Sequence, residues 1–277
     1  MKFRICSFSF HRLLAEGKQD IFKYITDCKE LGVAELEPWN AHLSVVKDED
    51  AVLEAGSDPE NAALSAQSDA YLHKVKAAAD KAGLPFGCLA VDGAHIYEPS
   101  PEARRANRAV AYGWLEVAAW LGARQIRIDA GGPEDMPDDA FRIIVAGYHD
   151  LVARGVAQGT QVLIENHWGP SKIPENLVKI IEAVPGLGLL FDTHNWAPGT
   201  QERGWHTCAR YARATHIKTF SFDERGDEAT TDIPRAMQIL LDAGYDGPWG
   251  IESCPRDSDE YTGVRKAIAL IRRVLGA

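Results

Sequence analysis

Several features that would define a class of protein are missing from this sequence of 277 residues. The five cysteines include no CxxC pair, which argues against a disulfide framework and a thiolate zinc site and favours a reducing compartment. No run reaches the roughly 18 to 20 apolar residues of a membrane-spanning helix. Polar residues also interrupt the first fourteen positions, so we expect no signal peptide and no membrane partner, in a soluble, cytoplasmic protein.

Positive charge and glycine-rich turns are also scarce. Lys and Arg number 30 against 40 Asp and Glu, which gives a net charge of −10 and leaves no generic basic surface for nucleic acid. No GxGxxG or GxxxxGK[ST] turn follows an early strand, so the phosphate-binding loop of nucleotide-binding sheets is absent from the sequence. These absences argue against a nucleic-acid partner and against a doubly wound nucleotide-binding fold.

The sequence does contain regular alternation of short apolar runs with longer segments of helical spacing. A hydrophobic content of 45% supplies a sizeable core. About eight βα units in one chain of this length predict an α/β fold, a single (β/α)₈ TIM barrel over residues 1–277. The predicted strands are Phe3–Ser7, Val33–Glu37, Phe86–Val91, Gln125–Asp129, Gln161–Asn166, Gly188–Asp192, Thr215–Phe220 and Trp249–Ser253.

Helix candidates lie between these strands, and several end in a glycine that suits a left-handed cap. The predicted helices are Asp20–Leu31, Ser68–Ala82, Glu102–Leu121, Asp138–Gln158, Pro174–Val184 and Asp259–Val274. The least regular stretch, Ala41–Asn61, is acidic, and we interpret it as a long βα loop. It marks no domain boundary, because the alternation resumes after it.

Ligand-type side chains stand at the ends of four consecutive predicted strands: Glu165, Asp192, His216 and Glu252. All carboxyl ends of a parallel barrel point to one face, so these distant residues can converge there. Three carboxylates and an imidazole suit Mn²⁺ or Mg²⁺, and Co²⁺ or Zn²⁺ can also bind such a set. Any one of these residues alone has an ordinary structural explanation, such as a helix N-cap or a core histidine, but four at matching strand ends predict one divalent metal ion.

The strings around these positions, LIENHWG, FDTHNW, THIKTFSFD and GIES, resemble the sugar phosphate isomerase/epimerase family, the xylose-isomerase-like TIM barrels. The resemblance covers nearly the whole chain. It implies a divalent ion held by Glu165, Asp192, His216 and Glu252, with Glu165 and Glu252 as the catalytic pair on either side of the substrate carbon. The looser LGVAELEPW resembles the second strand of the family and places Glu37 near the site as a substrate-binding candidate.

The chemistry that this resemblance implies is proton transfer beside a carbonyl, which a Lewis acid makes more acidic. One glutamate removes the proton to leave an enediolate, and the other returns it. Return to the opposite face gives an epimer, and return to the neighbouring carbon gives an aldose–ketose isomer. Loss of a β-leaving group instead gives a lyase or dehydratase of a keto-sugar, keto-glycoside or inosose. The sequence leaves these outcomes open.

Polar neighbours of the four residues are substrate-binding candidates. His167 and Lys218 each stand two residues past a predicted ligand, so in a strand they face the same side. Asn195 follows Asp192 by three and is a further candidate. Each also has an ordinary structural explanation: an exposed histidine, a lysine paired with a carboxylate, or a turn asparagine. For Arg127 at the end of the fourth strand we favour a simple ion pair with Asp129.

Three tryptophans, Trp39, Trp168 and Trp196, follow strand ends that carry these polar groups, and such rings can stack on a sugar or exclude water. We therefore add Trp39 and Trp168 to the substrate-binding candidates. The others are expected to pack in the core: Trp114, Trp120, Trp205 and Trp249.

The leading interpretation is a metal-dependent carbohydrate isomerase or epimerase, with the lyase as its alternative. Neither a glycine-rich anion nest nor a basic cluster beyond Lys218 and Arg256 indicates a phosphorylated substrate. An endonuclease IV-like repair enzyme would need more histidine ligands and a basic groove, and a non-catalytic barrel would not need four ligand residues. Whether the chain forms a homo-oligomer stays open.

Overall fold

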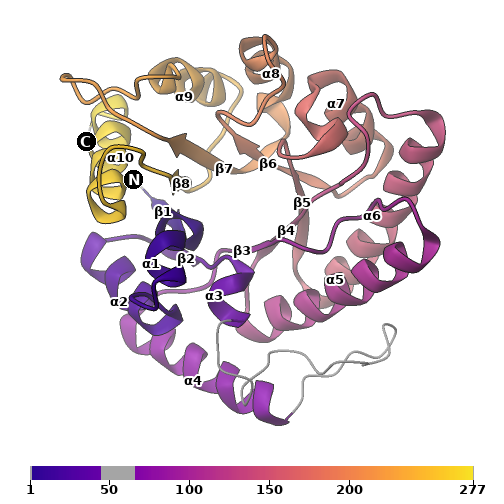
Figure 1. Ribbon diagram of the computed structural model, residues 1–277, viewed down its shortest axis with the longest axis horizontal. Coiled ribbons are helices and arrows are strands. Elements are labelled where there is room, and N and C mark those ends of the chain that lie inside the picture. The colour runs from indigo at the N-terminus through magenta and orange to yellow at the C-terminus, as the bar shows by residue number, and fades with distance from the viewer. Residues whose placement is uncertain (1, 45–65, 277) are drawn as a thin grey trace.

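Eight parallel strands form the wall of a barrel in the computed structural model, which describes residues 2–44 and 66–276. Helices surround this wall on the outside, as Figure 1 shows. The strand order is β2-β1-β8-β7-β6-β5-β4-β3, and isolated parallel bridges, Leu36 to Phe86 and Trp39 to Ala90, join β2 to β3. The strands are β1 (Phe3–Cys6), β2 (Glu35–Glu37), β3 (Cys88–Val91), β4 (Gln125–Ile128), β5 (Gln161–Glu165), β6 (Gly188–Asp192), β7 (Ala212–Thr219) and β8 (Trp249–Ser253).

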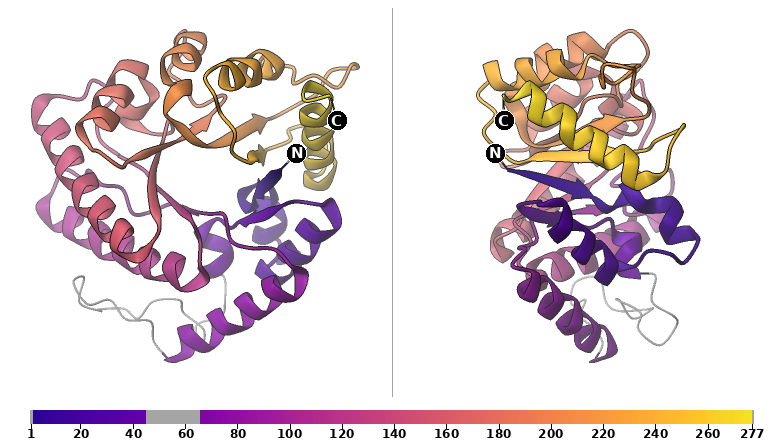
Figure 2. Two further views of the ribbon diagram at one scale, coloured as in Figure 1. Left: turned by 180° about the vertical axis from the view of Figure 1, so that it is seen from behind. Right: turned by 90° about the vertical axis from the view of Figure 1, so that its left-hand side faces the viewer.

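The predicted (β/α)₈ barrel is confirmed, and all six predicted helices are present. The α-helices are α1 (His11–Ala15), α2 (Ile21–Leu31), α3 (Asn40–Ser44), α4 (Ala66–Ala82), α5 (Pro101–Leu121), α6 (Asp138–Gln158), α7 (Pro174–Ala183), α8 (Gln201–Cys208), α9 (Ile233–Asp242) and α10 (Glu260–Val274). Short 3₁₀ turns are η1 (Ser7–Phe10), η3 (Gly169–Lys172) and η4 (Ala209–Tyr211). Figure 2 shows the helical layer from two further sides.

Local sequence signals explain where the predicted helices begin and end. The carboxylate of Asp20 accepts a hydrogen bond from the backbone N–H of Lys23 and so caps α2 instead of joining it. Asp259 caps α10 in the same way through Thr262. At the other end of α2, Gly32 has φ 74°, the left-handed conformation that glycine adopts without strain.

The structure corrects the bounds of several predicted elements. β2 begins at Glu35, two residues later than expected. β7 begins at Ala212, three residues earlier than expected, because its first residues pair with β6 despite the exposed Arg213. β3 begins at Cys88, two residues later than expected, since Phe86 makes only an isolated bridge. The predicted loop Ala41–Asn61 begins in a helix, as residues 41–44 belong to α3, and the rest of it lies outside the described residues.

The pairing of β6 with β7 contains an irregularity that sets the register of the site. Leu189 pairs with Ala212, but the next residue, Leu190, pairs with Ala214, so β7 carries one extra residue there. Beyond this bulge Asp192 lies opposite His216. The bulge therefore brings two of the predicted metal ligands level with each other.

The barrel interior is only partly apolar. Each of the predicted ligands Glu165, Asp192 and His216 follows by two an apolar residue that faces the same way, into the barrel. These residues, Leu163, Leu190 and Ala214, form a small buried cluster with Cys88. The cluster is separate from the main core, which lies between the strands and the helices. Deeper in the barrel, Arg4 is fully buried and forms an ion pair with Glu35. The interior layers of a TIM barrel are usually branched apolar residues, so this buried charge calls for an explanation.

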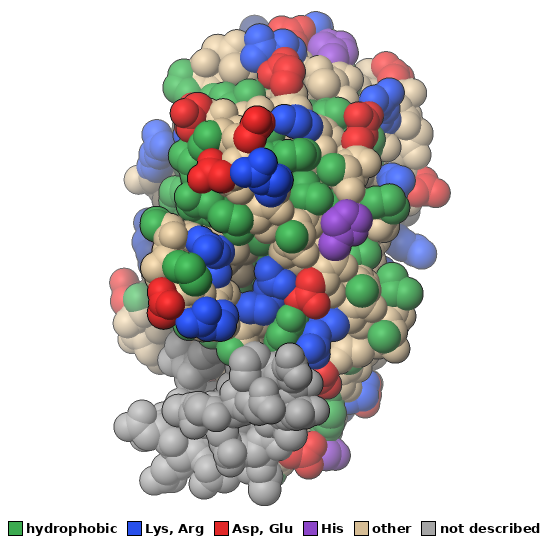
Figure 3. All heavy atoms as spheres, turned by 90° about the vertical axis from the view of Figure 1, so that its right-hand side faces the viewer, with side chains coloured by type: hydrophobic (Ala, Val, Ile, Leu, Met, Phe, Trp, Pro, Cys, Tyr) green, Lys and Arg blue, Asp and Glu red, His purple; other side chains and the backbone are tan. Residues whose placement is uncertain are grey.

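The outer surface mixes charges of both signs. On the face in Figure 3, basic and acidic side chains are interspersed. Within residues 2–44 and 66–276, none of the helices combines the length and apolar character needed to cross a membrane.

Candidate metal centre and substrate pocket

The four predicted ligand residues converge at the carboxyl end of the barrel. Glu165 ends β5, Asp192 ends β6, His216 lies within β7 and Glu252 lies near the end of β8. One potential ligand atom from each lies within 4.8 Å of the others. All four residues are buried, with at most 7% of their surface exposed. Strand ends separated by up to 36 positions thus build one compact cluster, as the parallel topology requires.

The polar atoms of this cluster fit a cation. In the described part of the chain, His216 Nδ1 and Asp192 Oδ2 are buried without a hydrogen-bond partner, and Glu165 Oε2 has only the ion-pair contact with Arg127. Burial raises the pKa of Asp192 to about 7, because the pull of Lys218 only partly offsets burial and the repulsion of Glu252 and Glu165. A divalent ion would satisfy the orphaned atoms and keep the carboxylates ionised. The cluster can therefore hold a metal ion.

A cation from a neighbouring strand pairs with each of the two glutamates. Lys218 Nζ lies 3.2 Å from Glu252 Oε2, and Arg127 Nε lies 3.0 Å from Glu165 Oε2. Burial alone would raise the pKa of Glu252, but Lys218 and His216 together hold it well below the usual range. The arrangement therefore keeps Glu252 ionised at neutral pH.

Arg127 forms two ion pairs in addition to the one predicted with Asp129. The predicted ion pair with Asp129 is present, at 3.0 Å. The same guanidinium also contacts Asp92 at 2.7 Å and Glu165, so it links the fourth strand to the ligand cluster. The sequence signal was available, since Arg127 is an inward-facing charge in an apolar strand, but its partner on β5 is 38 residues away.

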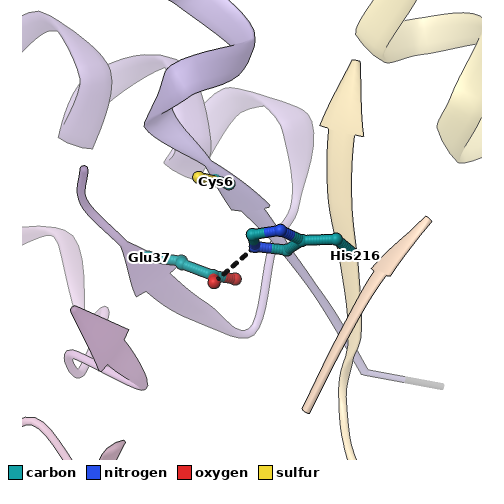
Figure 4. A group of neighbouring side chains, drawn as sticks. All are labelled: Cys6, Glu37 and His216. Atoms are coloured by element: carbon teal, nitrogen blue, oxygen red, sulfur yellow. Dashed lines mark hydrogen bonds and ion pairs between the residues drawn. The ribbon is translucent and has the colours of Figure 1, made fainter. Parts of the chain in front are cut away.

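Glu37 lies beneath the cluster and not in an open pocket. Its side chain is fully buried, and its Oε1 lies 2.8 Å from His216 Nε2 while its Oε2 lies 2.6 Å from Arg4 Nε. Figure 4 shows the His216 ring reaching from β7 toward Glu37, with Cys6 beside them at the end of β1. The expected substrate contact of Glu37 is thus not what this geometry supports, because both oxygens face protein cations or hydrogen-bond donors.

A cavity of about 510 Å³ opens at the mouth of the barrel. Four of the predicted substrate-binding residues line it: His167, Trp168, Asn195 and Lys218. Phe8, His11, Lys172, Phe220 and Cys254 line it too, and the sequence analysis missed them. Of these, Phe220 and Cys254 had a sequence signal, since they stand two residues past Lys218 and Glu252 and so share the face of those residues.

Hydrogen bonds fix two of the lining side chains. His167 Nδ1 lies 3.0 Å from Asp129 Oδ2, and although burial lowers the pKa of His167, Asp129 and Glu165 raise it to about 9 overall. The Asn195 amide nitrogen lies 3.3 Å from Glu165 Oε1. Both side chains are therefore held beside the ligand cluster, while their contact with a substrate stays a prediction.

The tryptophans divide into rim and core residues. Trp168 is 53% exposed at the cavity, and Trp196 lines the cavity although it is buried. Trp39 packs edge-on against Phe8, with ring centroids 5.0 Å apart, and its indole nitrogen donates to Asp92, so it supports the wall of the cavity from behind. The core tryptophans are packed as predicted: Trp114, Trp205 and Trp249 are buried and Trp120 is partly buried.

Solved structures similar to this one include proteins with sugar ligands and metal. A D-psicose 3-epimerase from Clostridium cellulolyticum H10, in complex with D-tagatose, superimposes with a TM-score of 0.70 at 17% identity, covering 99% of each chain. The 3-keto-D-glucoside 4-epimerase of E. coli gives 0.68 at 18% identity, covering 92% of this chain and 95% of that chain. A xylose isomerase-like TIM barrel protein from Mycobacterium smegmatis, in complex with magnesium, gives 0.65 at 17% identity, covering 92% and 87%.

Identities this low show a shared fold. No curated protein sequence matches the chain significantly. The model of one family, described as xylose isomerase-like TIM barrel, matches residues 25–274. That match spans most of the barrel and includes all four residues of the ligand cluster, and so the chain belongs to the xylose isomerase-like TIM barrel family.

Proposed function

We propose that this protein is a divalent-metal-dependent carbohydrate isomerase or epimerase. The observation that carries the proposal is the convergence of Glu165, Asp192, His216 and Glu252 within 4.8 Å. Two of these residues contact side chains that line the cavity at the barrel mouth, Glu165 through Asn195 and Glu252 through Lys218. Two of the similar structures are sugar epimerases and one is a complex with magnesium, which supports the choice of reaction and of cofactor.

One Mn²⁺ or Mg²⁺ is the expected cofactor, because three carboxylates and one imidazole form a hard, oxygen-rich ligand set. When bound, the ion polarises a substrate carbonyl and makes the neighbouring C–H more acidic. The four residues of the cluster would hold it. Trp168, half exposed at the cavity, offers an aromatic face for a sugar ring.

Glu165 and Glu252 are the proposed proton-transfer pair. They lie at or near the carboxyl ends of strands five and eight, so they would face a substrate at the barrel mouth from two sides. Lys218 helps to keep Glu252 ionised and therefore able to accept a proton, and Arg127 forms an ion pair with Glu165. One glutamate removes the proton next to the carbonyl, and the other delivers a proton to the same or the neighbouring carbon.

His167, Asn195 and Lys218 are the proposed substrate-orienting residues. Each lines the cavity, and each is fixed by a contact with the ligand cluster or with Asp129. A side chain whose position is already fixed loses little conformational entropy when it binds a hydroxyl group. These contacts would set which carbon of the sugar faces the two glutamates.

The test is glutamate-to-glutamine substitution with two readouts, metal content and solvent deuterium uptake by ketoses, keto-glycosides and inososes. Glu165→Gln and Glu252→Gln retain size and one ligand oxygen but remove the base. Glu175→Gln, in an exposed ion pair with Arg203, is the matched control and should behave as wild type. Asp192→Ala and His216→Ala should lose stoichiometric metal while the barrel stays folded.

The pattern of labelling separates the reactions. Loss of exchange in one glutamine variant, with exchange but no product in the other, supports a two-base epimerase. Loss of exchange in both leaves isomerase and lyase outcomes, which the product itself distinguishes. Full activity in either variant removes that glutamate from the mechanism. Unchanged metal content in both Asp192→Ala and His216→Ala refutes the ligand assignment.

A further inference from the structure

His216 connects the ligand cluster to a buried line of charged groups deeper in the barrel. Its Nδ1 lies 3.3 Å from Glu165 Oε1 and 3.1 Å from Glu252 Oε2. On the opposite side of the ring, Nε2 lies 2.8 Å from Glu37 Oε1, the contact drawn in Figure 4. The two ring nitrogens therefore face different surroundings, and only Nδ1 faces the predicted ligands.

The line continues from Glu37 through ion pairs of alternating sign. Glu37 Oε2 lies 2.6 Å from Arg4 Nε, and Arg4 Nη1 lies 2.9 Å from Glu35 Oε1. Arg124, which is half exposed, contacts the other oxygen of Glu35. The line thus runs from the surface, through three buried charged side chains, to the imidazole of His216.

The surrounding strands leave room for this line. A Cβ at Gly87 would lie 2.1 Å from Glu35 Oε1, and a Cβ at Gly250 would lie 3.3 Å from Glu37 Oε2 and 1.9 Å from the Thr215 carbonyl oxygen. Burying three charges in a barrel is expensive unless each is paired. A paired, glycine-flanked line that ends on one particular ring nitrogen points to a role at that ring.

We propose that Glu37 is a positioning residue for the metal centre: it binds the Nε2–H of His216, so that the lone pair of Nδ1 faces Glu165, Asp192 and Glu252. The inference rests on the proposed metal-dependent function. A neutral imidazole carries its proton on either nitrogen, and the hydrogen bond made by one nitrogen decides which of the two can bind a metal. An ionised carboxylate at the far nitrogen also orients the ring and increases its basicity as a ligand.

Cys6, Glu37 and His216 also place three ligand-type atoms within 4.8 Å of one another, which raises the alternative that they bind an ion themselves. The surroundings disfavour this alternative. Arg4 already occupies one oxygen of Glu37, and a second cation beside this buried guanidinium would be repelled. Burial raises the pKa of the Cys6 thiol to about 11, so an ion bound there would have to displace the thiol proton at neutral pH.

The experiment compares Glu37→Gln with Glu35→Gln. Both variants remove a buried carboxylate that pairs with Arg4, but only Glu37 contacts His216. The affinity for Mn²⁺, measured by calorimetry on the full chain, should fall about 10- to 100-fold in Glu37→Gln, as for other carboxylate partners of ligand histidines. In Glu35→Gln it should stay within about threefold of wild type. Equal losses in the two variants would show a general structural effect and overturn the proposal.

Nitrogen-15 NMR of the histidine side chains reports directly which ring nitrogen of His216 carries a proton. In wild-type protein loaded with Mg²⁺, His216 should show a protected Nε2–H signal, and this signal should shift in Glu37→Gln. If the single variant folds poorly, Arg4→Met/Glu37→Met removes the charge and its partner together and should abolish the protected signal. A proton on Nδ1 in the loaded wild type, or an unchanged Nε2–H signal in folded Glu37 variants, refutes the assignment.

Two further outcomes distinguish a failure of this proposal from a failure of the proposed function. A second equivalent of Co²⁺ with a thiolate-to-cobalt absorption band would show that Cys6, Glu37 and His216 bind an ion, and would overturn the proposal. If the wild type binds no divalent ion, the proposed function fails, and so does the positioning of a metal centre. The metal-free Nε2–H signal would then report only whether the hydrogen bond itself forms.

Discussion

Replacing Arg127 by methionine tests whether the buried charges at the mouth of the barrel depend on one another. The guanidinium is 5% exposed and contacts three carboxylates, two of which, Asp129 and Glu165, are 1% exposed. Methionine retains much of the length and apolar volume but supplies no charge and no donor. In the metal-free protein, the substitution leaves two buried carboxylates without their main cation, and the imidazoles of His167 and His216 remain beside Asp129 and Glu165, respectively.

The expected loss of unfolding free energy is about 3–5 kcal/mol, the range for removing one partner of a buried ion pair. For a domain of this size the loss corresponds to a fall in Tm of roughly 6–15 °C. The assay is thermal and denaturant unfolding with a chelator present. The matched control is Arg203→Met, whose ion pair with Glu175 is more than half exposed on both sides, and it should lose less than about 1 kcal/mol.

The double variant Arg127→Met/Asp129→Asn provides the internal check. If the buried carboxylate causes the loss, neutralising Asp129 should recover part of it, and the two substitutions should not be additive. A loss for Arg127→Met no larger than that of Arg203→Met would refute the reasoning, because the two carboxylates would then not need the guanidinium.

Two further predictions concern the same site. His167→Asn and Lys218→Met should retain stoichiometric metal but weaken turnover or substrate binding, measured as kcat and KM on an active substrate; wild-type values in both would assign these residues a structural role only. In metal-free protein, Asp192→Asn should gain stability relative to wild type as the pH rises from about 4 to 7. Burial holds the pKa of Asp192 at about 7 in the folded state, against an ordinary value of 3.8, so the folded wild type binds the extra proton and loses up to about 4 kcal/mol over that range. A difference between the unfolding curves that does not change with pH would contradict this prediction.

The fold and the ligand cluster were predictable because both follow from strand periodicity. A parallel barrel brings every strand end to one face, so Glu165, Asp192 and Glu252 could be placed together from strand ends alone. His216 required only that its strand continue past it. No pairing geometry was needed for these predictions, only the count of strands and their direction.

The contacts between strands were not predictable. Arg4 and Glu35 are single charges in short apolar strands, and nothing in one sequence indicates that they pair with each other and with Glu37 inside the barrel. Glu37 was expected near the site as a substrate-binding candidate, and its contacts with His216 and Arg4 were not predicted, because alternation fixes which side of a strand a residue faces and not how deep in the barrel it lies. The contact of Arg127 with Glu165 was missed for the same reason.

The bulge at Arg213 makes the site depend on how β7 pairs with β6 as well as on its residue types. Alternate residues of a strand face opposite sides, so regular pairing onward from Ala212 and Leu189 would place Thr215 opposite Asp192 and turn His216 and Lys218 out of the barrel. A homologue could therefore retain all four residues of the ligand cluster in its sequence and still not bring them together, if its β7 had the same length but paired with β6 without the bulge.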